Sequence, residues 1–272
     1  MQEAVDALIR TCASVTWGIT IAVDGTRSTA AGAGGALPTA SMCKVFLLIE
    51  VARRIVDGTL DPDERLTAEP DERVGDSGLW QHLCEPDLAI GSLAALVGAV
   101  SDNTATNVLL RRVGLDRVRA VSVALGMPQT LLADRIRDVR GPADPPAPSF
   151  GRSDDLARLM AGLSSGTVES PEVSALVVGW LAADTDLSMV ASAFALDPLA
   201  HADGVIRLFH KTGTDVGVRA DAGHVEGPSG AVSYAVLAAW EPFADPILEA
   251  GHVGAVLQVM RGIGNLIHAQ VS

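Results

Sequence analysis

The sequence predicts a mixed α/β (α+β) fold, in which an antiparallel sheet flanked by helices carries an all-helical lobe. Two observations support this prediction. Segments with strand character lie near both ends of the 272-residue chain, whereas the middle of the chain has the pattern of consecutive helices. Hydrophobic residues make up 48% of the chain, so it can bury a substantial core as one large domain or two closely packed ones.

The first half of the chain provides most of the predicted helices. Residues 3–13 have helical periodicity, and residues 17–25 are a predicted strand that ends in a turn. Residues 30–40 are predicted to form a loop. From Ser41 to about Val56 the pattern is apolar on nearly all sides, which is typical of a helix inside a protein. Further helices are predicted over residues 92–100, 104–113, 116–125, 154–163 and 171–181.

The second half of the chain returns to strands. Residues 141–149 are rich in proline and predict an ordered loop or a linker. Three strands are predicted over residues 205–213, 216–226 and 231–240, followed by a helix over about 251–268. We expect one sheet from both chain ends, with the first and last helices on one face. The predicted lobes are 1–38 with 192–272, and 39–191, with a site between them.

Charge and composition limit the partners of this chain. Its 33 acidic and 20 basic residues give a net charge of −13, which argues against nucleic acid or an anionic membrane as a partner. The longest apolar stretch, residues 88–100, is too short to span a bilayer. Three cysteines without metal-ligand spacing and an N-terminus unlike a secretory signal predict a cytoplasmic protein without metal or cofactor. A chain trimmed of an export leader would look the same.

Three short motifs follow one another along the chain: Ser41-Met42-Cys43-Lys44, Ser101-Asp102-Asn103 and Lys211-Thr212-Gly213. Each motif alone is weak evidence. Their order, with 60 residues between the first two serines, is a specific signal.

The lysines supply an observation that is independent of these motifs. Lys44 and Lys211 are the only two lysines among 20 basic residues. Arginine keeps its proton in proteins, whereas a desolvated lysine can lose it. Chance is the alternative explanation, but the pattern indicates that Lys44 must be able to become neutral and that a compact ammonium is preferred at Lys211.

The spacing of the first motif suggests a nucleophile and its base. Residues three apart share one helix face, so the Lys44 amine can reach the Ser41 hydroxyl. Ser41 lies at a predicted helix N-terminus, where the helix dipole favours negative charge. Burial would lower the pKa of Lys44 and make it a base. The alternative is structural, with Ser41 as a helix cap and Lys44 as a buried donor.

The other two motifs would complete a site in the cleft. Ser101 could relay a proton to the leaving group while the Lys211 ammonium holds it in place. Asn103 could bind a substrate amide, although this motif also suits a helix cap. Gly213 permits a substrate to approach the strand backbone closely, and the backbone amides of Ser41 and Thr214 could form an oxyanion hole.

Taken together, these motifs resemble those of the penicillin-recognising serine enzymes, and specifically class A β-lactamases, over essentially the whole chain. The resemblance implies a β-lactamase/transpeptidase-like fold, a Ser41 acylated by a β-lactam, and Lys44 as its proton acceptor. It also implies β-lactam breakdown and antibiotic resistance. For Trp80, which matches an aromatic residue at the cleft rim, ordinary core packing is an alternative. The resemblance implies substrate-binding roles for Asn103, Asn107, Thr212, Gly213, Thr214, Arg219 and Trp80.

One departure from the family concerns deacylation. In class A enzymes, a Glu in a loop begun by Asp-Arg activates the water that hydrolyses the acyl-enzyme. Here Asp134 and Arg135 begin that loop, but Arg137 falls at the position of the Glu, and arginine cannot act as a general base. Asp138 follows directly and could take this role if the loop is rebuilt. We therefore expect acylation to be intact and deacylation to be slow.

Three functions remain open at this stage. The first is a β-lactamase, the second a hydrolase or acyl transferase for another peptide, amide or ester, and the third a sensor that stays acylated. Residues 75–78, Gly-Asp-Ser-Gly, resemble the serine motif of trypsin-like proteases. In those enzymes the catalytic His precedes the Ser, but no His precedes Ser77 here, so this segment is predicted to be a turn. His210 is interpreted as a strand residue rather than a catalyst. The oligomeric state is left open.

Overall fold

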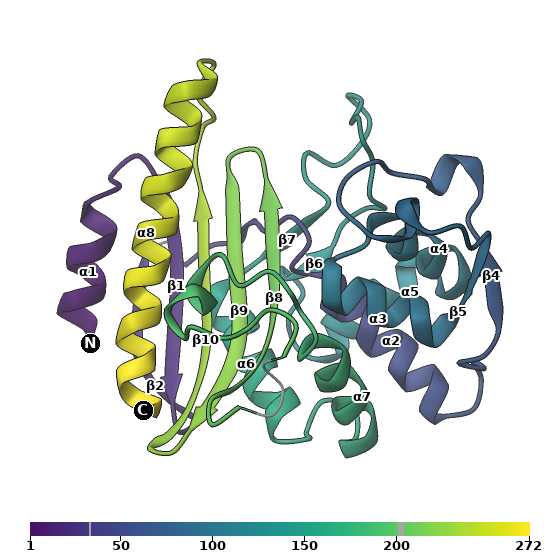
Figure 1. The fold of residues 1–272 in the computed structure, drawn as a ribbon, viewed down its shortest axis with the longest axis horizontal. Helices are drawn as coiled ribbons and strands as arrows, with labels where there is room; N and C mark the ends of the chain where they lie inside the picture. Colours follow the sequence, from purple (N-terminus) through teal and green to yellow (C-terminus); the bar gives the residue numbers. More distant parts are fainter. Residues whose placement is uncertain (33, 201–203) are drawn as a thin grey trace.

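A five-stranded antiparallel sheet forms the centre of the molecule (Figure 1), in the strand order β2–β1–β10–β9–β8. The computed structural model describes residues 1–32, 34–200 and 204–272. The strand bounds are β1 Thr16–Val23, β2 Thr26–Gly32, β8 Arg207–Asp215, β9 Val218–Gly227 and β10 Gly230–Ala239. Since β1 pairs with β10, the two chain ends share one sheet, and the predicted α/β fold class is confirmed.

Helices cover both faces of this sheet and form a separate cluster beside it (Figure 1). The N-terminal and C-terminal helices, α1 and α8, lie on one face, as expected. On the other face α6 packs against β10, β9 and β1. The bounds are α1 Gln2–Arg10, α2 Lys44–Val56, α3 Ile90–Val100, α4 Asn103–Val113, α5 Leu115–Ala124, α6 Ser153–Ser164, α7 Pro171–Leu181 and α8 Pro246–Val271.

Short elements connect these layers. The 3₁₀ helices are η1 Pro70–Glu72, η2 Trp80–His82 and η3 Val190–Ala193. One small sheet has the order β3–β7–β6, and β4 pairs with β5. These strands are β3 Leu37–Pro38, β4 Arg65–Thr67, β5 Asp87–Ala89, β6 Leu131–Leu132 and β7 Ser149–Gly151.

The structure differs from the predicted elements at several boundaries. The predicted loop over residues 30–40 contains the end of β2, an edge strand of small residues whose partner is β1. The final helix starts at Pro246, five residues early, because the Asp245 carboxylate caps the N–H groups of Ile247 and Leu248. The edge strand depends on a partner strand that its own residues do not reveal, whereas the Asp245 cap is a local feature of the sequence.

The predicted two-lobe division stays an interpretation, because α6 belongs by sequence to the helical lobe but packs on the sheet. Ala33 and residues 201–203 fall within the predicted sheet lobe and lie outside the described residues. Among the described residues, no helix combines the length and the apolar character needed to cross a bilayer.

Candidate active site

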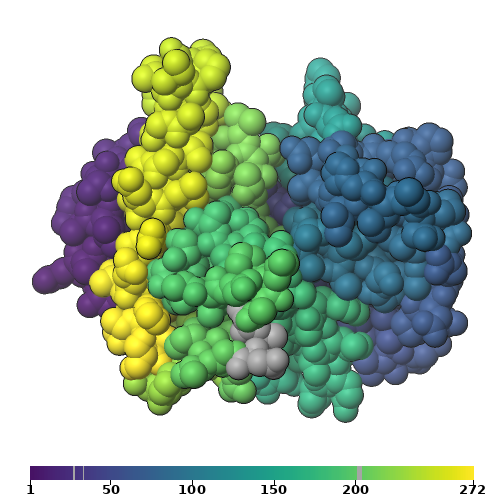
Figure 2. Space-filling model, viewed as in Figure 1, coloured from purple at the N-terminus to yellow at the C-terminus, as the bar shows by residue number. Residues whose placement is uncertain are grey.

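A cleft of about 710 Å³ lies where the sheet meets the helical cluster. Its walls come from the turn before α2, the ends of α3 and β8, the loop before β7, and the first turns of α8. Figure 2 shows the surface hollowed between the start of α8, in yellow-green, and the teal loop that faces it. Four residues of the three motifs line this cleft, namely Ser41, Ser101, Asn103 and Thr212, and Thr214, directly after the third motif, lines it as well.

 The cleft therefore brings together side chains from all three motifs.

The Ser41 turn precedes α2, which begins at Lys44 instead of at Ser41 as predicted. The backbone N–H of Lys44 donates to the Ser41 carbonyl at 3.2 Å, so the turn leads directly into the helix. Ala40, directly before the serine, has a left-handed φ of 49°. Burial raises the pKa of the neighbouring Cys43 thiol to about 12, which leaves Ser41 as the nucleophile candidate of this turn.

Lys44 is fully buried, and its amine contacts the second motif. Its Nζ donates to the Ser101 carbonyl and to Asn103 Oδ1, both at 2.6 Å, and lies 3.2 Å from Ser101 Oγ. Burial and the positive charge of Lys211 hold the pKa of Lys44 well below its ordinary value, although Asp102 opposes them. Both effects favour the free-amine form of Lys44, whose amine contacts the Ser101 and Asn103 side chains that line the cleft.

The second motif is held in place by its own backbone and by Asp102. Ser101 ends α3 in the left-handed region, with φ of 55°, which turns its side chain toward the cleft. The Asp102 carboxylate caps α4 by accepting from Ala105 N–H, and it also accepts from the N–H groups of Leu79 and Trp80. The Asn103 amide donates to the Asp76 carbonyl. Asp102 thus caps α4 and also holds its two neighbours, Ser101 and Asn103, in the site.

The third motif lies on β8, and its backbone passes beside the Ser41 turn. A Cβ on Gly213 would lie 2.1 Å from the Thr39 carbonyl oxygen and 3.2 Å from the Ser41 nitrogen. The close approach that we expected of a substrate is therefore made by the chain itself. Lys211 is fully buried, its Nζ donates to the Thr212 carbonyl at 2.9 Å, and Asp184 Oδ2 lies 4.0 Å away.

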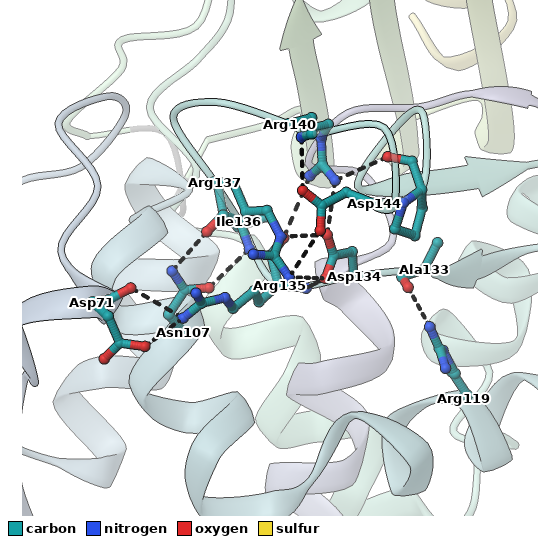
Figure 3. A network of polar contacts seen from close by, with 12 residues as sticks. Asp71, Asn107, Arg119, Ala133, Asp134, Arg135, Ile136, Arg137, Arg140 and Asp144 are labelled. Carbon is teal, nitrogen blue, oxygen red and sulfur yellow. Dashed lines mark hydrogen bonds and ion pairs between the residues drawn. The ribbon is translucent and has the colours of Figure 1, made fainter.

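The loop before β7 forms the opposite wall and is rich in ion pairs (Figure 3). The Asp134 carboxylate accepts from Arg137 Nε and Arg140 NH1, each at 2.8 Å. Arg137 also pairs with Asp144 at 3.4 Å. Asn107 binds the same loop, because its amide donates to the Ile136 carbonyl at 2.9 Å and accepts from the Ile136 N–H at 2.8 Å.

A family profile described as the β-lactamase enzyme family matches residues 1–252. The chain belongs to the β-lactamase enzyme family. No curated protein sequence matches the chain.

Solved structures agree with this assignment. A β-lactamase from Sphaerobacter thermophilus is 26% identical, with a TM-score of 0.79 over 97% of this chain and 98% of that one. An ancestral class A β-lactamase is 22% identical, with a TM-score of 0.79 over 98% of each chain. A variant of PBP-A, described as an acyl-enzyme complex with penicillin G, is 23% identical, with a TM-score of 0.77 over 98% and 97%. The last two show the fold alone, and the predicted β-lactamase/transpeptidase fold is confirmed.

Not every residue with a predicted role in this β-lactamase family member lies in the cleft. Arg219 and Asp138 line it, and Arg219 stacks 5.9 Å from the Trp240 ring centre. Trp80 instead packs in the core, 4% exposed, and its indole N–H donates to the Glu85 carbonyl. Asn107 is buried beneath the loop, where its amide is occupied by backbone groups. The structure thus favours core packing for Trp80 and loop binding for Asn107.

Several residues of the site were not found from the sequence. Ser77, in a segment predicted only as a turn, lines the cleft and donates to the Ser101 carbonyl at 3.3 Å. Asp184 and Asp186 approach from the segment after α7, where no motif marks them. Among the described residues, no group of three or more His, Cys, Asp or Glu side chains is arranged to hold a metal ion.

Proposed function

We propose that this chain is a class A-like serine hydrolase that forms an acyl-enzyme on Ser41 with a β-lactam or a related amide. One observation carries this proposal. The buried Lys44 amine, with its lowered pKa, lies in hydrogen-bond contact with the Ser101-Asn103 segment beside a cleft that Ser41 lines.

The proposed acylation step uses Ser41, Lys44 and Ser101. The free amine of Lys44 takes the proton of the Ser41 hydroxyl as Oγ forms a bond to the amide carbon of the substrate. The backbone N–H groups of Ser41 and Thr214 stabilise the negative charge on the substrate oxygen. The proton then passes from Lys44 through the Ser101 hydroxyl to the leaving nitrogen, and the C–N bond breaks.

Binding of the substrate falls to the strand side of the cleft. Thr212 and Arg219, which line the cleft, are proposed to bind the substrate carboxylate, and the buried Lys211 ammonium is proposed to add positive charge behind them. Asn103 is proposed to bind the substrate amide. Its side chain accepts a hydrogen bond from Lys44 and donates one to the Asp76 carbonyl, so it would also link the substrate to the base.

Deacylation is proposed to be slow. The Arg137 guanidinium is held by Asp134 and Asp144 at the position where a class A enzyme has its carboxylate base. Asp138 lines the cleft, and its carboxylate accepts from the Gly75 N–H at 3.3 Å. If water completes the reaction, Asp138 is the proposed base.

The same arginine favours a second function. A cleft that acylates readily but activates water poorly suits an acyl transferase or hydrolase for another amide, ester or peptide, or a sensor that stays acylated.

Mass spectrometry of the intact protein after exposure to benzylpenicillin tests the proposal. We expect one added penicilloyl group on the native chain and none on Ser41→Ala. Turnover of a chromogenic cephalosporin should be slow, and Asp138→Asn should lengthen the lifetime of the adduct. Absence of both adduct and turnover in the native protein would rule out a β-lactam as the acyl donor.

A further inference from the structure

Three acidic residues lie around Lys211, and the proposed reaction uses none of them. Asp184 and Asp186 come from the segment after α7, and Asp221 comes from β9, the strand beside β8. Burial lowers the pKa of Lys211 below its ordinary value, and all three carboxylates act in the opposite direction, Asp184 most strongly. The question is which of them serves as the counter-ion of this ammonium.

Asp221 already has other partners. Its Oδ1 accepts from the Tyr234 hydroxyl and from His210 Nδ1, each at 3.1 Å, and its Oδ2 accepts from the Val190 N–H at 3.0 Å. Burial acts to lower the pKa of His210, but the charges of Asp221 and Asp184 outweigh it and raise this pKa. Three donors therefore compensate the charge of Asp221.

Asp186 is also held by neighbours. Its carboxylate accepts from the Ser188 hydroxyl at 2.6 Å and from the Ser188 N–H at 3.2 Å. Its side chain is less buried than that of Asp184, so water can screen part of its charge.

Asp184 has no such compensation on one of its oxygens. It is 1% exposed, and Oδ1 accepts from the Asp186 N–H at 3.0 Å. Oδ2 forms no hydrogen bond with a described residue, and it faces Lys211 Nζ at 4.0 Å. A buried carboxylate is costly without a charge partner, so Lys211 and Asp184 stabilise each other's charged forms.

We propose that Asp184 is a positioning residue whose carboxylate keeps Lys211 protonated, and that the Lys211 ammonium in turn keeps Lys44 in the free-amine form. The effect of this arrangement on catalysis rests on the proposed function, whereas the protonation states of the two lysines do not. In this arrangement Asp184 is a carboxylate, Lys211 is an ammonium and Lys44 is a neutral amine. Burial raises the pKa of Asp184, whereas Lys211 and then His210 lower it, and Lys211 lowers the pKa of Lys44.

The two-lysine composition allows a direct test. Protein labelled with ¹³C at the lysine ε carbon gives one signal from Lys44 and one from Lys211, assigned with Lys44→Met and Lys211→Met. In Asp184→Asn, we expect the titration midpoint of Lys211 to fall, because its counter-ion is lost. In Lys211→Met, we expect the midpoint of Lys44 to rise, because the positive charge that lowers it is removed.

Acylation should also respond in Asp184→Asn. The pH range in which Lys211 is charged and Lys44 is neutral narrows at its alkaline end, so the alkaline limb of the acylation profile moves to lower pH. For a fall of one pKa unit in Lys211, the acylation rate on that limb should decrease about tenfold at a given pH. Asn keeps the Oδ1 acceptor for the Asp186 N–H, so the fold should persist. Asp184→Glu, which keeps the charge, should restore the Lys211 midpoint.

Asp116→Asn is the matched control, because this acid is 97% exposed and lies outside the cleft. It should leave both lysine titrations unchanged. An unshifted Lys211 midpoint in Asp184→Asn would overturn the inference, whether or not the native protein reacts with a β-lactam. If that variant does not fold, an unchanged Lys44 midpoint in Lys211→Met would overturn the second half of the chain of charges. Failure of acylation in the native protein would instead refute only the proposed function.

Discussion

Lys44 and Lys211 are both fully buried, but their surroundings suit opposite protonation states. Around Lys44 the hydrogen-bond partners are neutral oxygens, and the charge with the largest effect on its pKa is the positive one of Lys211, which Asp102 opposes. Around Lys211 the influential charges are all carboxylates. Burial lowers the pKa of both amines, and the difference in neighbouring charge separates a base from a binding cation.

At this same residue scale, Gly213 should be intolerant of a side chain. Gly213→Ala would place Cβ 2.1 Å from the Thr39 oxygen, so β8 and the Ser41 turn must separate. We expect a loss of about 1–3 kcal/mol in the free energy of unfolding, as for overpacking elsewhere. Acylation of Ser41, measured under conditions where the variant is folded, should fall as well.

The control for this prediction is Gly179→Ala in α7, where a Cβ has no neighbour within 4 Å. This change should stabilise the protein by up to about 1 kcal/mol through helix propensity, and it should leave acylation unchanged. Native-like acylation by folded Gly213→Ala would show that the close approach does not position Ser41.

The element that decides the character of the cleft is the loop before β7. Its prolines exclude regular structure, and its shape is held by Asp134 and Asn107 instead. Burial raises the pKa of Asp134, but the hydrogen bonds from Arg137 and Arg140 outweigh it and leave this pKa below its ordinary value. The ion pairs thus fix Arg137 in the cleft wall.

Asp134→Asn should loosen this loop. The change removes the charge that two arginines share, and we expect a cost of about 1–3 kcal/mol together with faster hydrogen exchange over residues 134–145. Because the folded pKa is depressed, the stabilisation by Asp134 is present above its unfolded pKa and is lost as pH falls through the folded value. The native protein should therefore lose its advantage over the variant only in acid.

Asp138→Asn serves as the comparison for this experiment, because Asp138 is exposed and lies in the same loop. Its exchange pattern should match that of the native protein. Equal exchange in Asp134→Asn and native protein would mean that backbone contacts alone, such as those of Asn107, hold the loop.

For the whole molecule, one sheet separates two hydrophobic cores. Ala235 and Leu237 of β10 face the core of the helical cluster, whereas Tyr234 and Val236 face the core under α8. Since alternate residues of the same strands belong to both cores, the cores should unfold together.

Calorimetry of Leu48→Ala and Ile21→Ala tests this expectation. Leu48 lies in the first core and Ile21 in the second, and both are fully buried. Each change should cost about 2–5 kcal/mol and lower the same single transition. A variant that lowers only one of two resolved transitions would show that the lobes are independent.

The three motifs, the order of the elements and the missing glutamate could be read directly from the sequence. Each is a local pattern, because Ser41 and Lys44 share a turn, and Lys211 to Gly213 share a strand. The scarcity of lysine was equally visible. These local signals were enough to predict the fold class and the family.

Only the tertiary structure decided which distant groups surround those motifs. Asp184 lies 27 residues before Lys211 in the chain, and no periodicity links the two, yet they are 4.0 Å apart in the fold. Trp80 packs in the core, and β2 exists because β1 lies beside it. Burial and charge act through space, so the protonation of a site depends on neighbours that the order of residues does not reveal.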